Sequence, residues 1–402
     1  MNRLWKLPGM FSPVQLTPAA SGYLDIVRSL AAVAVFLDHW RACILADYGD
    51  VDPVLKTLPV KALYFLSGFG PQAVMIFFVL SGLFISSSVL RSLERGKWSW
   101  RDYAIDRAVR LYVVLIPALV LGALWDFLGI HFFSDSGVYL AIATRLFRWQ
   151  AFLGSLFFVQ TRFTPSFGSN DPLWSLFNEF WYYALFPVLL GLIIALNRRR
   201  LAALGYVGAA AAICWMLGGQ IWGFAVWLAG GAVALTSRWF RFKGQDRWPL
   251  LAYTTAAGAL AAICLTVARN KGGWLGSGLA VGVSFAFLTH GMVQWTFGPG
   301  EIGQRLGRIF AGFSYSLYLV HVPIVFLIRA VLMHSGWLPK ARWQPDGVHL
   351  LIGAAVSAAV FSYAFALAQM TEARTSVVRS WVRNRVAHQL PAPLASSAGR
   401  LS

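Results

Sequence analysis

Residues 71–92 read PQAVMIFFVLSGLFISSSVLRS, and Arg91 is the only charged residue among them. A helix needs about 20 mostly apolar residues to cross the hydrocarbon core of a membrane, and this stretch meets that requirement. The whole chain has the same character, since 58% of its 402 residues are hydrophobic and 12% are charged. Ordinary soluble domains carry about 25% charged residues. The sequence therefore predicts an all-α protein, a bundle of helices that span a membrane several times.

Ten ranges are long and apolar enough to be predicted as spans. They are about 24–45, 71–92, 108–130, 172–196, 201–217, 220–236, 250–268, 275–297, 309–332 and 347–370. A further apolar stretch, 149–160, is too short to cross and ends in a polar run, so we interpret it as re-entrant or interfacial. With ten spans and a cytoplasmic N-terminus, about twice as many Lys and Arg residues fall inside as outside, as the positive-inside rule requires. An eleventh span at 149–160 would reverse that excess.

Both termini are then expected in the cytoplasm. Residues 1–20 form a cytoplasmic segment, 21–372 the membrane domain, and 373–402 a basic tail whose end is expected to be disordered. Arg3 and Lys6 are not followed by an apolar core with a cleavage site, so no cleaved signal peptide is predicted. The net charge of +18 lies mostly in short loops, which indicates membrane orientation rather than nucleic-acid binding. The cysteines are isolated, so neither a disulfide framework nor a zinc site is predicted.

The first predicted span contains ionisable residues, which are costly in lipid unless they are paired or face a cavity. Arg28 and His39 are eleven residues apart, so they share one helix face, about 16 Å apart along its axis. Their type and depth make both candidate site residues. Without a function, Arg28 would be a snorkelling anchor and His39 a hydrogen-bonded packing residue. Asp38 points elsewhere on the helix and is expected to pair with Arg41.

Glu179 is the candidate carboxylate of the fourth span. If that helix starts at the outer membrane surface, Glu179 lies about as deep as His39. A carboxylate and an imidazole at one depth could form the base and its orienting partner in acyl transfer to a hydroxyl. The alternative is a structural ion pair of Glu179 with Arg41 or Arg162.

Pro323 is predicted to kink the ninth span beside His321. A proline has no backbone N–H and therefore leaves the carbonyl of Leu319 without its helical partner. Kinked polar membrane helices often line cavities, although His321 could equally be a plain helix–helix hydrogen-bond donor. In the second span, Ser81 and Gly82 are predicted to allow close helix packing.

Four motifs stand in order between about residues 20 and 372. They are Tyr23–Ala32 running on to His39, Phe77–Ile85, Trp174-Ser175-Leu176 followed by Glu179 and Tyr182–Pro187, and Ser314–Pro323. In this order and spacing they resemble the acyltransferase 3 family of bacterial membrane proteins. The resemblance implies transfer of an acyl group, usually acetyl, from cytoplasmic acetyl-CoA to a hydroxyl of an extracytoplasmic glycan or glycolipid.

The resemblance also implies roles for particular residues. The Arg-x10-His motif of the family falls on Arg28 and His39, with His39 as the essential residue. The Arg-x-x-Arg pair falls on Arg107 and Arg110, which suit the phosphates of coenzyme A because they lie in the densest basic loop. Positive-inside anchoring is the alternative explanation for this pair. His39 would either deprotonate the acceptor or carry the acyl group itself.

The sequence thus predicts three groups of site residues. The catalytic residues are His39 and Glu179, the donor-binding residues are Arg28, Arg107 and Arg110, and the substrate-binding or orienting residues are Tyr318, His321, Trp174 and Ser81. Acetyl-CoA is the expected donor, and no metal is expected. The expected partners are membrane lipids and a glycan or lipid-linked glycan, not nucleic acid, in a bacterial inner membrane, and the oligomeric state stays open. A transporter or flippase, or a polysaccharide-export factor without transferase chemistry, is the alternative function.

Overall fold

The computed structural model describes residues 16–237, 239–242, 247–271, 275–337 and 342–388, and it confirms the all-α fold. The long helices are α1 (Pro18–Ile44), α3 (Gly70–Glu94), α4 (Trp100–Phe132), α6 (Leu173–Asn197), α7 (Ala202–Leu217), α8 (Ile221–Thr236), α9 (Arg247–Lys271), α10 (Leu275–Met292), α11 (Glu301–His334) and α12 (Gly347–Met370). The shorter helices are α2 (Leu58–Leu66), α5 (Trp149–Leu156) and α13 (Thr375–His388). Most of the predicted N-terminal segment 1–20 and the end of the predicted tail, 389–402, lie outside the described residues.

Each of the ten predicted spans coincides with one helix. Eight stretches of the described chain are long and apolar enough to cross a membrane. One of them, Ala202–Thr236, contains both α7 and α8, and Ser277–Met292 within α10 is a shorter apolar helix. The structure therefore contains a multi-pass bundle, while the count of ten crossings stays a prediction. The first part of the predicted tail forms α13, and the prediction for its end falls on residues outside the described ranges.

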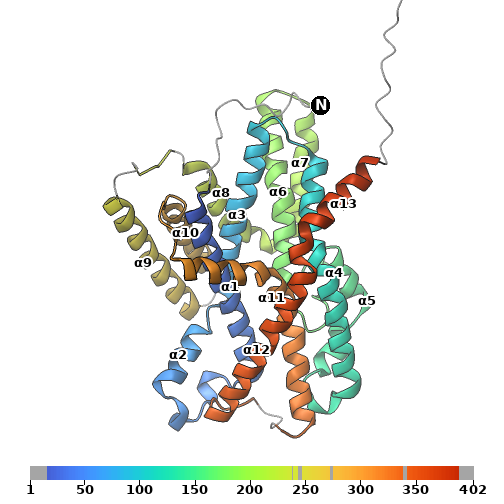
Figure 1. Cartoon of the computed structure of the whole chain (residues 1–402). Coiled ribbons are helices and arrows are strands. Elements are labelled where there is room, and N and C mark those ends of the chain that lie inside the picture. The colour runs from blue at the N-terminus through green and yellow to red at the C-terminus, as the bar shows by residue number, and fades with distance from the viewer. Residues whose placement is uncertain (1–15, 238, 243–246, 272–274, 338–341, 389–402) are drawn as a thin grey trace, which may run out of the picture.

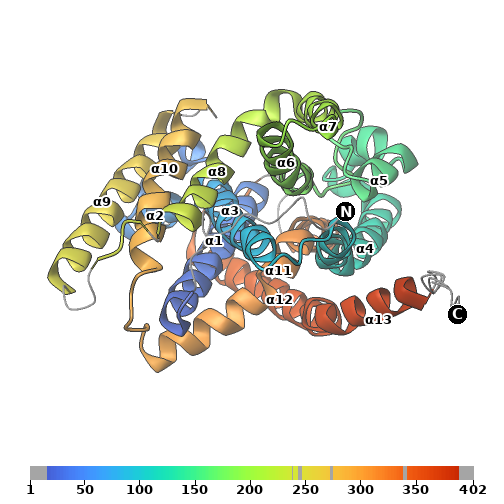
Figure 2. The same cartoon turned by 90° about the horizontal axis from the view of Figure 1, so that it is seen from above.

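The helices are arranged around α1, α3 and α11 (Figures 1 and 2). Seen from above, α9 and α10 lie on one side of the molecule, and α5, α6 and α7 lie on the other. The end of the bundle where α3 passes to α4 and α6 passes to α7 carries the basic clusters 91–110 and 198–200, and we call it the basic end. The first part of α11 lies across the bundle and its second part runs along the bundle axis (Figure 1).

Glycine brings α3 and α8 into close contact. A Cβ atom added at Gly82 would overlap the Trp227 carbonyl, and one added at Gly230 would overlap the Val79 carbonyl. Only hydrogen side chains at these two positions allow the backbones to approach so closely. The prediction that Ser81 and Gly82 lie in a close helix contact is confirmed, and α8 is the partner.

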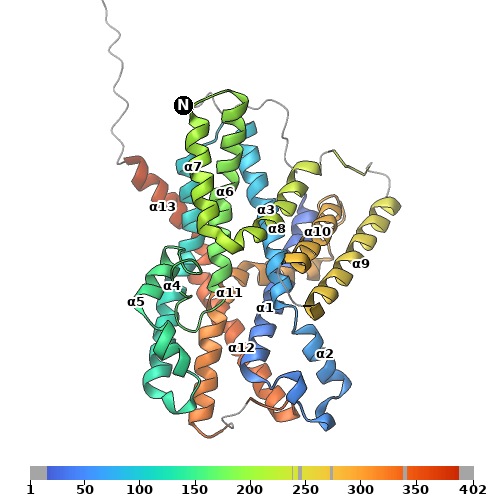
Figure 3. The ribbon, with the colours of Figure 1, turned by 180° about the vertical axis from the view of Figure 1, so that it is seen from behind.

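The segment between α5 and α6 folds into the bundle. The predicted stretch 149–160 forms the eight-residue helix α5 and a following turn, so it does not cross. Phe158, Gln160 and Asn170 are all buried. The Trp181 indole donates to the Phe158 carbonyl at 2.8 Å, which ties the turn to α6. The hairpin of α7 and α8 turns well inside the height of the bundle (Figure 3).

Candidate active site

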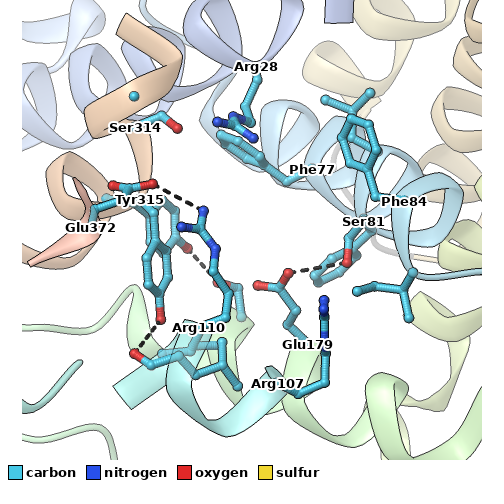
Figure 4. A pocket seen from close by; sticks show the side chains of 18 of the residues that line it. Arg28, Phe77, Ser81, Phe84, Arg107, Arg110, Glu179, Ser314, Tyr315 and Glu372 are labelled. Atoms are coloured by element: carbon cyan, nitrogen blue, oxygen red, sulfur yellow. Dashed lines mark hydrogen bonds and ion pairs between the residues drawn. The ribbon is translucent and has the colours of Figure 1, made fainter. Parts of the chain in front are cut away.

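A cavity of about 860 Å³ lies among α1, α3, α4, α6 and α11 and is closed by the segment that follows α12 (Figure 4). Arginines outnumber carboxylates on its wall. The arginines are Arg28, Arg107, Arg110, Arg308 and Arg379, and the carboxylates are Glu179 and Glu372. We call this space the arginine cavity. Its excess of guanidinium groups favours a ligand with several negative charges, phosphate above all.

The arginine pair of α4 reaches this cavity as one unit. Arg107 and Arg110 are three residues apart, so they project from the same side of the helix. The Arg110 guanidinium donates to Glu372 at 3.1 Å and lies 5.3 Å from the centre of the Tyr315 ring. The Arg107 guanidinium lies 5.9 Å from the centre of the Tyr183 ring. The two predicted donor-binding arginines therefore face a common space at the basic end.

Arg28 reaches the same cavity from α1. Its guanidinium crosses to α11 and donates to the Ala311 carbonyl at 2.8 Å. This contact turns Arg28 into the bundle, which is not the geometry of an anchor that snorkels to the membrane surface. Near the other end of α1, Arg41 donates to Asp38 at 3.2 Å, so the predicted pairing of these two residues is confirmed.

Glu179 lies in the arginine cavity and not beside His39. Its carboxylate accepts hydrogen bonds from Ser81, at 3.2 Å, and from Tyr183 (Figure 4). The predicted pairing of Glu179 with His39 is therefore wrong, and so is the alternative ion pair with Arg41, whose partner is Asp38. The error has a physical cause, because the buried segment before α6 makes that helix begin inside the bundle rather than at its surface.

His39 is instead paired with the second candidate histidine. Nδ1 of His39 lies 2.9 Å from Nε2 of His321, and the ring centres are 5.1 Å apart in a stacked arrangement. Nδ1 of His321 lies 2.9 Å from the Leu317 carbonyl, one turn back on α11. The chain from a carbonyl through two imidazoles joins α11 to α1. His321 is therefore a partner of His39 rather than a solitary packing residue.

This hydrogen-bond chain assigns the tautomers of both rings. A carbonyl can only accept, so Nδ1 of His321 carries the proton and Nε2 of His321 accepts from His39. Nδ1 of His39 is then the donor and Nε2 carries the lone pair, to which no hydrogen bond is formed within the described residues. An imidazole in this form can take a proton from a hydroxyl or attack a carbonyl carbon.

The kink at Pro323 fixes the position of His321. The carbonyl of Leu319, which Pro323 cannot satisfy, accepts a hydrogen bond of 2.7 Å from the Asn170 side chain. Asn170 belongs to the segment folded in before α6, so that segment supports the bend from outside α11. The predicted loss of the helical partner of Leu319 is confirmed, and Asn170 supplies the replacement donor.

Tyr318 connects the arginine cavity with the histidine pair. Its hydroxyl hydrogen-bonds to Ser175 at 2.6 Å and donates to the Pro172 carbonyl at 3.1 Å, while its ring lines the cavity. The ring centre lies 6.1 Å from that of His321. Trp174, another predicted substrate residue, lies half-buried in the first turn of α6, where Ser175 contributes to the cavity wall.

A second cavity, of about 530 Å³, is lined from α1 by Asp38 and Arg41, which lie on either side of His39 in the sequence. Its wall includes Asp38, the residue before His39, together with Arg41, Gln72 and Arg269, and it shares no lining residue with the arginine cavity. The Oε1 atom of Gln72 is buried and has no hydrogen-bond partner in the described part of the chain. We call this space the outer cavity. It is polar enough to receive a hydroxylated ligand.

Sequence reasoning missed several residues of the site. Glu372 is the last residue of the predicted membrane domain, just after its last span, and Arg379 lies in the stretch interpreted as a basic tail. The lone acidic residue directly after that span was a usable signal for Glu372. Tyr183 lies in the motif Tyr182–Pro187 and was assigned no role of its own. It lies one helical turn after Glu179 and therefore on the same face of the helix. Among the described residues, no group of three or more metal-ligating side chains gathers at any point.

Comparison with known proteins now identifies the family. The sequence matches the acyltransferase 3 model, described as an acyltransferase domain, over residues 21–368. The chain belongs to this family. The protein is thus a multi-pass membrane acyltransferase, as the resemblance implied. No curated protein and no solved structure matches the acyltransferase in the same comparison. The four motifs of this sequence lie within residues 21–368, which the family model matches. Glu372 and α13 come after the matched residues.

Proposed function

We propose that this acyltransferase moves an acetyl group from acetyl-CoA to a hydroxyl of a glycan or lipid-linked glycan on the other side of a bacterial inner membrane. One observation carries the proposal, namely the His39 imidazole with its Nε2 lone pair free and its Nδ1 held by His321. This is the form that acyl transfer to oxygen needs from a base or a nucleophile.

The arginine cavity suits the donor. The positive-inside rule assigns the basic end, and with it both termini, to the cytoplasm, where acetyl-CoA is made. Arg28, Arg107 and Arg110 would hold the donor phosphates, with Glu179 and Ser81 further along the wall. The arm of coenzyme A would pass Tyr318 to bring the thioester to His39.

The outer cavity suits the acceptor. Asp38 on its wall precedes His39 in α1, and the wall offers carboxylate, guanidinium and amide groups that can bind sugar hydroxyls. The two cavities share no lining residue, so donor and acceptor would bind in separate spaces. A transfer reaction across a membrane requires such an arrangement.

Two routes complete the transfer with balanced atoms. In the direct route, Nε2 of His39 takes the proton of the acceptor hydroxyl while the hydroxyl oxygen forms a bond to the thioester carbon. The carbon–sulfur bond then breaks, and the imidazolium returns the proton to the departing thiolate. In the relayed route, Nε2 attacks the thioester carbon, the carbon–sulfur bond breaks, and coenzyme A leaves as its thiolate. The acceptor oxygen then bonds to the acetyl carbon as the carbon–nitrogen bond breaks, and the hydroxyl proton passes through Nε2 to solvent, which protonates the thiolate. In either route His321 accepts the hydrogen bond of Nδ1 as positive charge develops on His39.

The test uses cells that lack the gene and carry either the wild-type protein or His39→Ala. We expect wild-type cells to show acetyl esters on surface glycans by mass spectrometry, and His39→Ala cells to lose them at equal protein level. His334→Ala changes an exposed histidine at the end of α11 and serves as the control. Unchanged acetylation in His39→Ala cells would overturn the proposal in favour of a transporter or an export factor.

A further inference from the structure

Helix α13 lies after the family-matched residues and still forms part of the wall of the arginine cavity. The match ends at residue 368, whereas the cavity wall includes Glu372 and Arg379. Figures 1 and 2 show α13 running from the end of α12 along the outside of α4. A segment outside the common domain therefore closes the cavity that we assign to the donor.

Two sets of contacts fix this segment in place. Glu372 accepts from Arg110 at 3.1 Å and from the Ser316 hydroxyl at 3.2 Å, which joins the start of the segment to α4 and α11. Farther along, Arg383 of α13 donates to Asp106 of α4 at 2.8 Å. Asp106 and Arg110 are four residues apart and lie on the same face of α4. The segment is thus held against one stripe of α4 at two points.

Arg379 is not needed for that attachment. Its closest approach to Asp106 is 3.5 Å, and Asp106 already accepts the shorter bond from Arg383. The Nε atom of Arg379 is the one that lies 3.5 Å from Asp106, where it forms an ion pair but no hydrogen bond. The terminal nitrogens of its guanidinium form no hydrogen bond within the described ranges, and the residue lies on the wall of the arginine cavity. A guanidinium with unused donors on the wall of a cavity rich in arginine is placed for an anion rather than for packing.

We propose that Arg379 binds a phosphate at the nucleotide end of coenzyme A, so that α13 selects donors that carry the nucleotide. This inference rests on the proposed donor. Glu372 has a separate role, because its carboxylate orients Arg110 toward the same ligand. Acceptance of a thioester would then depend on a helix that lies after the acyltransferase domain itself.

The experiment measures binding of coenzyme A and of pantetheine to the purified full-length protein by isothermal titration calorimetry, so no acceptor is needed. We expect Arg379→Gln to weaken coenzyme A binding about 10-fold, equivalent to about 1.4 kcal/mol. Pantetheine lacks the nucleotide, so its affinity should not change. Arg379→Lys keeps the charge but loses the planar set of guanidinium donors. Its affinity for coenzyme A should therefore lie between those of the wild type and Arg379→Gln.

Arg385→Gln is the matched control, because it removes an exposed arginine of the same helix that stacks on Trp381 and is not among the residues lining the cavity. It should bind coenzyme A like the wild type. Equal coenzyme A affinity in wild type and Arg379→Gln would overturn this inference while leaving the proposed function intact, as would an equal loss for pantetheine and coenzyme A. Absence of coenzyme A binding to the wild type would overturn both. If Arg379→Gln does not fold, the comparison of Arg379→Lys with Arg385→Gln decides.

Discussion

Nδ1 of His39 and Nε2 of His321 lie 2.9 Å apart, although the two residues are separated by 282 positions in the sequence. The contact fixes the orientation of the His39 imidazole. The sequence alone predicted only how deep in the membrane this residue lies. Because His321 is itself held by the Leu317 carbonyl, the direction of every proton in this chain is determined.

His321→Ala should lower kcat about 10²-fold or more, because Nδ1 of His39 loses its acceptor and the ring loses its tautomer. His321→Gln should keep much of the activity, since its amide oxygen can accept from His39 and its amide nitrogen can donate to Leu317. Acetyl-CoA turnover by purified protein measures both variants. If the two variants lost activity equally, the hydrogen bond would not be what His321 contributes.

Asn170→Ala should destabilise the protein by about 1–3 kcal/mol, because the buried Leu319 carbonyl is left without a donor. Pro323→Ala restores a backbone N–H to that carbonyl. In the Pro323→Ala background, Asn170→Ala should therefore cost less than it does alone. Thermal unfolding of the four proteins of this double-mutant cycle measures the difference. Simple additivity would show that Asn170 does not replace the missing proline donor.

Gly82→Ala should destabilise the contact between α3 and α8 by about 1–3 kcal/mol, since a methyl group overlaps the Trp227 carbonyl. Gly208→Ala in α7 is the matched control, because a Cβ atom there meets open space. Alanine also has the higher helix propensity, so the control should be neutral or slightly stabilising. Melting temperatures in detergent compare the two, and equal effects would contradict the close contact.

Asp346 should make the stability of the N-terminal end of α12 depend on pH. It caps this helix by accepting from the His349 backbone N–H at 2.9 Å, and this bond holds the pKa of Asp346 below its ordinary value of 3.8. A carboxyl whose pKa is lower in the folded state stabilises the fold above its unfolded pKa. That contribution is lost as pH falls from about 4 through the folded pKa.

The variants of Asp346 separate capping from charge. Asp346→Ala should cost about 1 kcal/mol at neutral pH, and Asp346→Asn should keep most of the cap. Unfolding followed between pH 6 and pH 3 should show a steeper acid loss for the wild type than for Asp346→Asn. Equal slopes would exclude this carboxylate as the source.

Much of the fold was predictable because the requirement of lipid is simple. Ten apolar ranges became ten helices, and Pro323 freed the carbonyl of Leu319 as its chemistry demands. The common location of Arg28, Arg107 and Arg110 was also predictable from the sequence, since their positions in the predicted spans place all three near one membrane face. Periodicity and charge suffice where a residue's environment is set by its own helix.

Contacts between distant helices were not predictable in this way. Glu179 was assigned to the wrong depth because nothing in the sequence indicated that the segment before α6 folds inward. The pairing of His39 with His321 depends on how α1 packs on α11. Arg379 was hidden for another reason, since basic residues after a last span are usually orientation signals.

The hairpin of α7 and α8 has a consequence for the lipid around the protein. Each helix has 16 residues, so each is about 24 Å long, less than the roughly 30 Å of an average hydrocarbon core. If both helices cross the membrane, we expect the bilayer to thin beside this hairpin. A thinner bilayer would shorten the distance between its two aqueous faces on that flank, so we expect turnover to depend on the acyl-chain length of the host membrane.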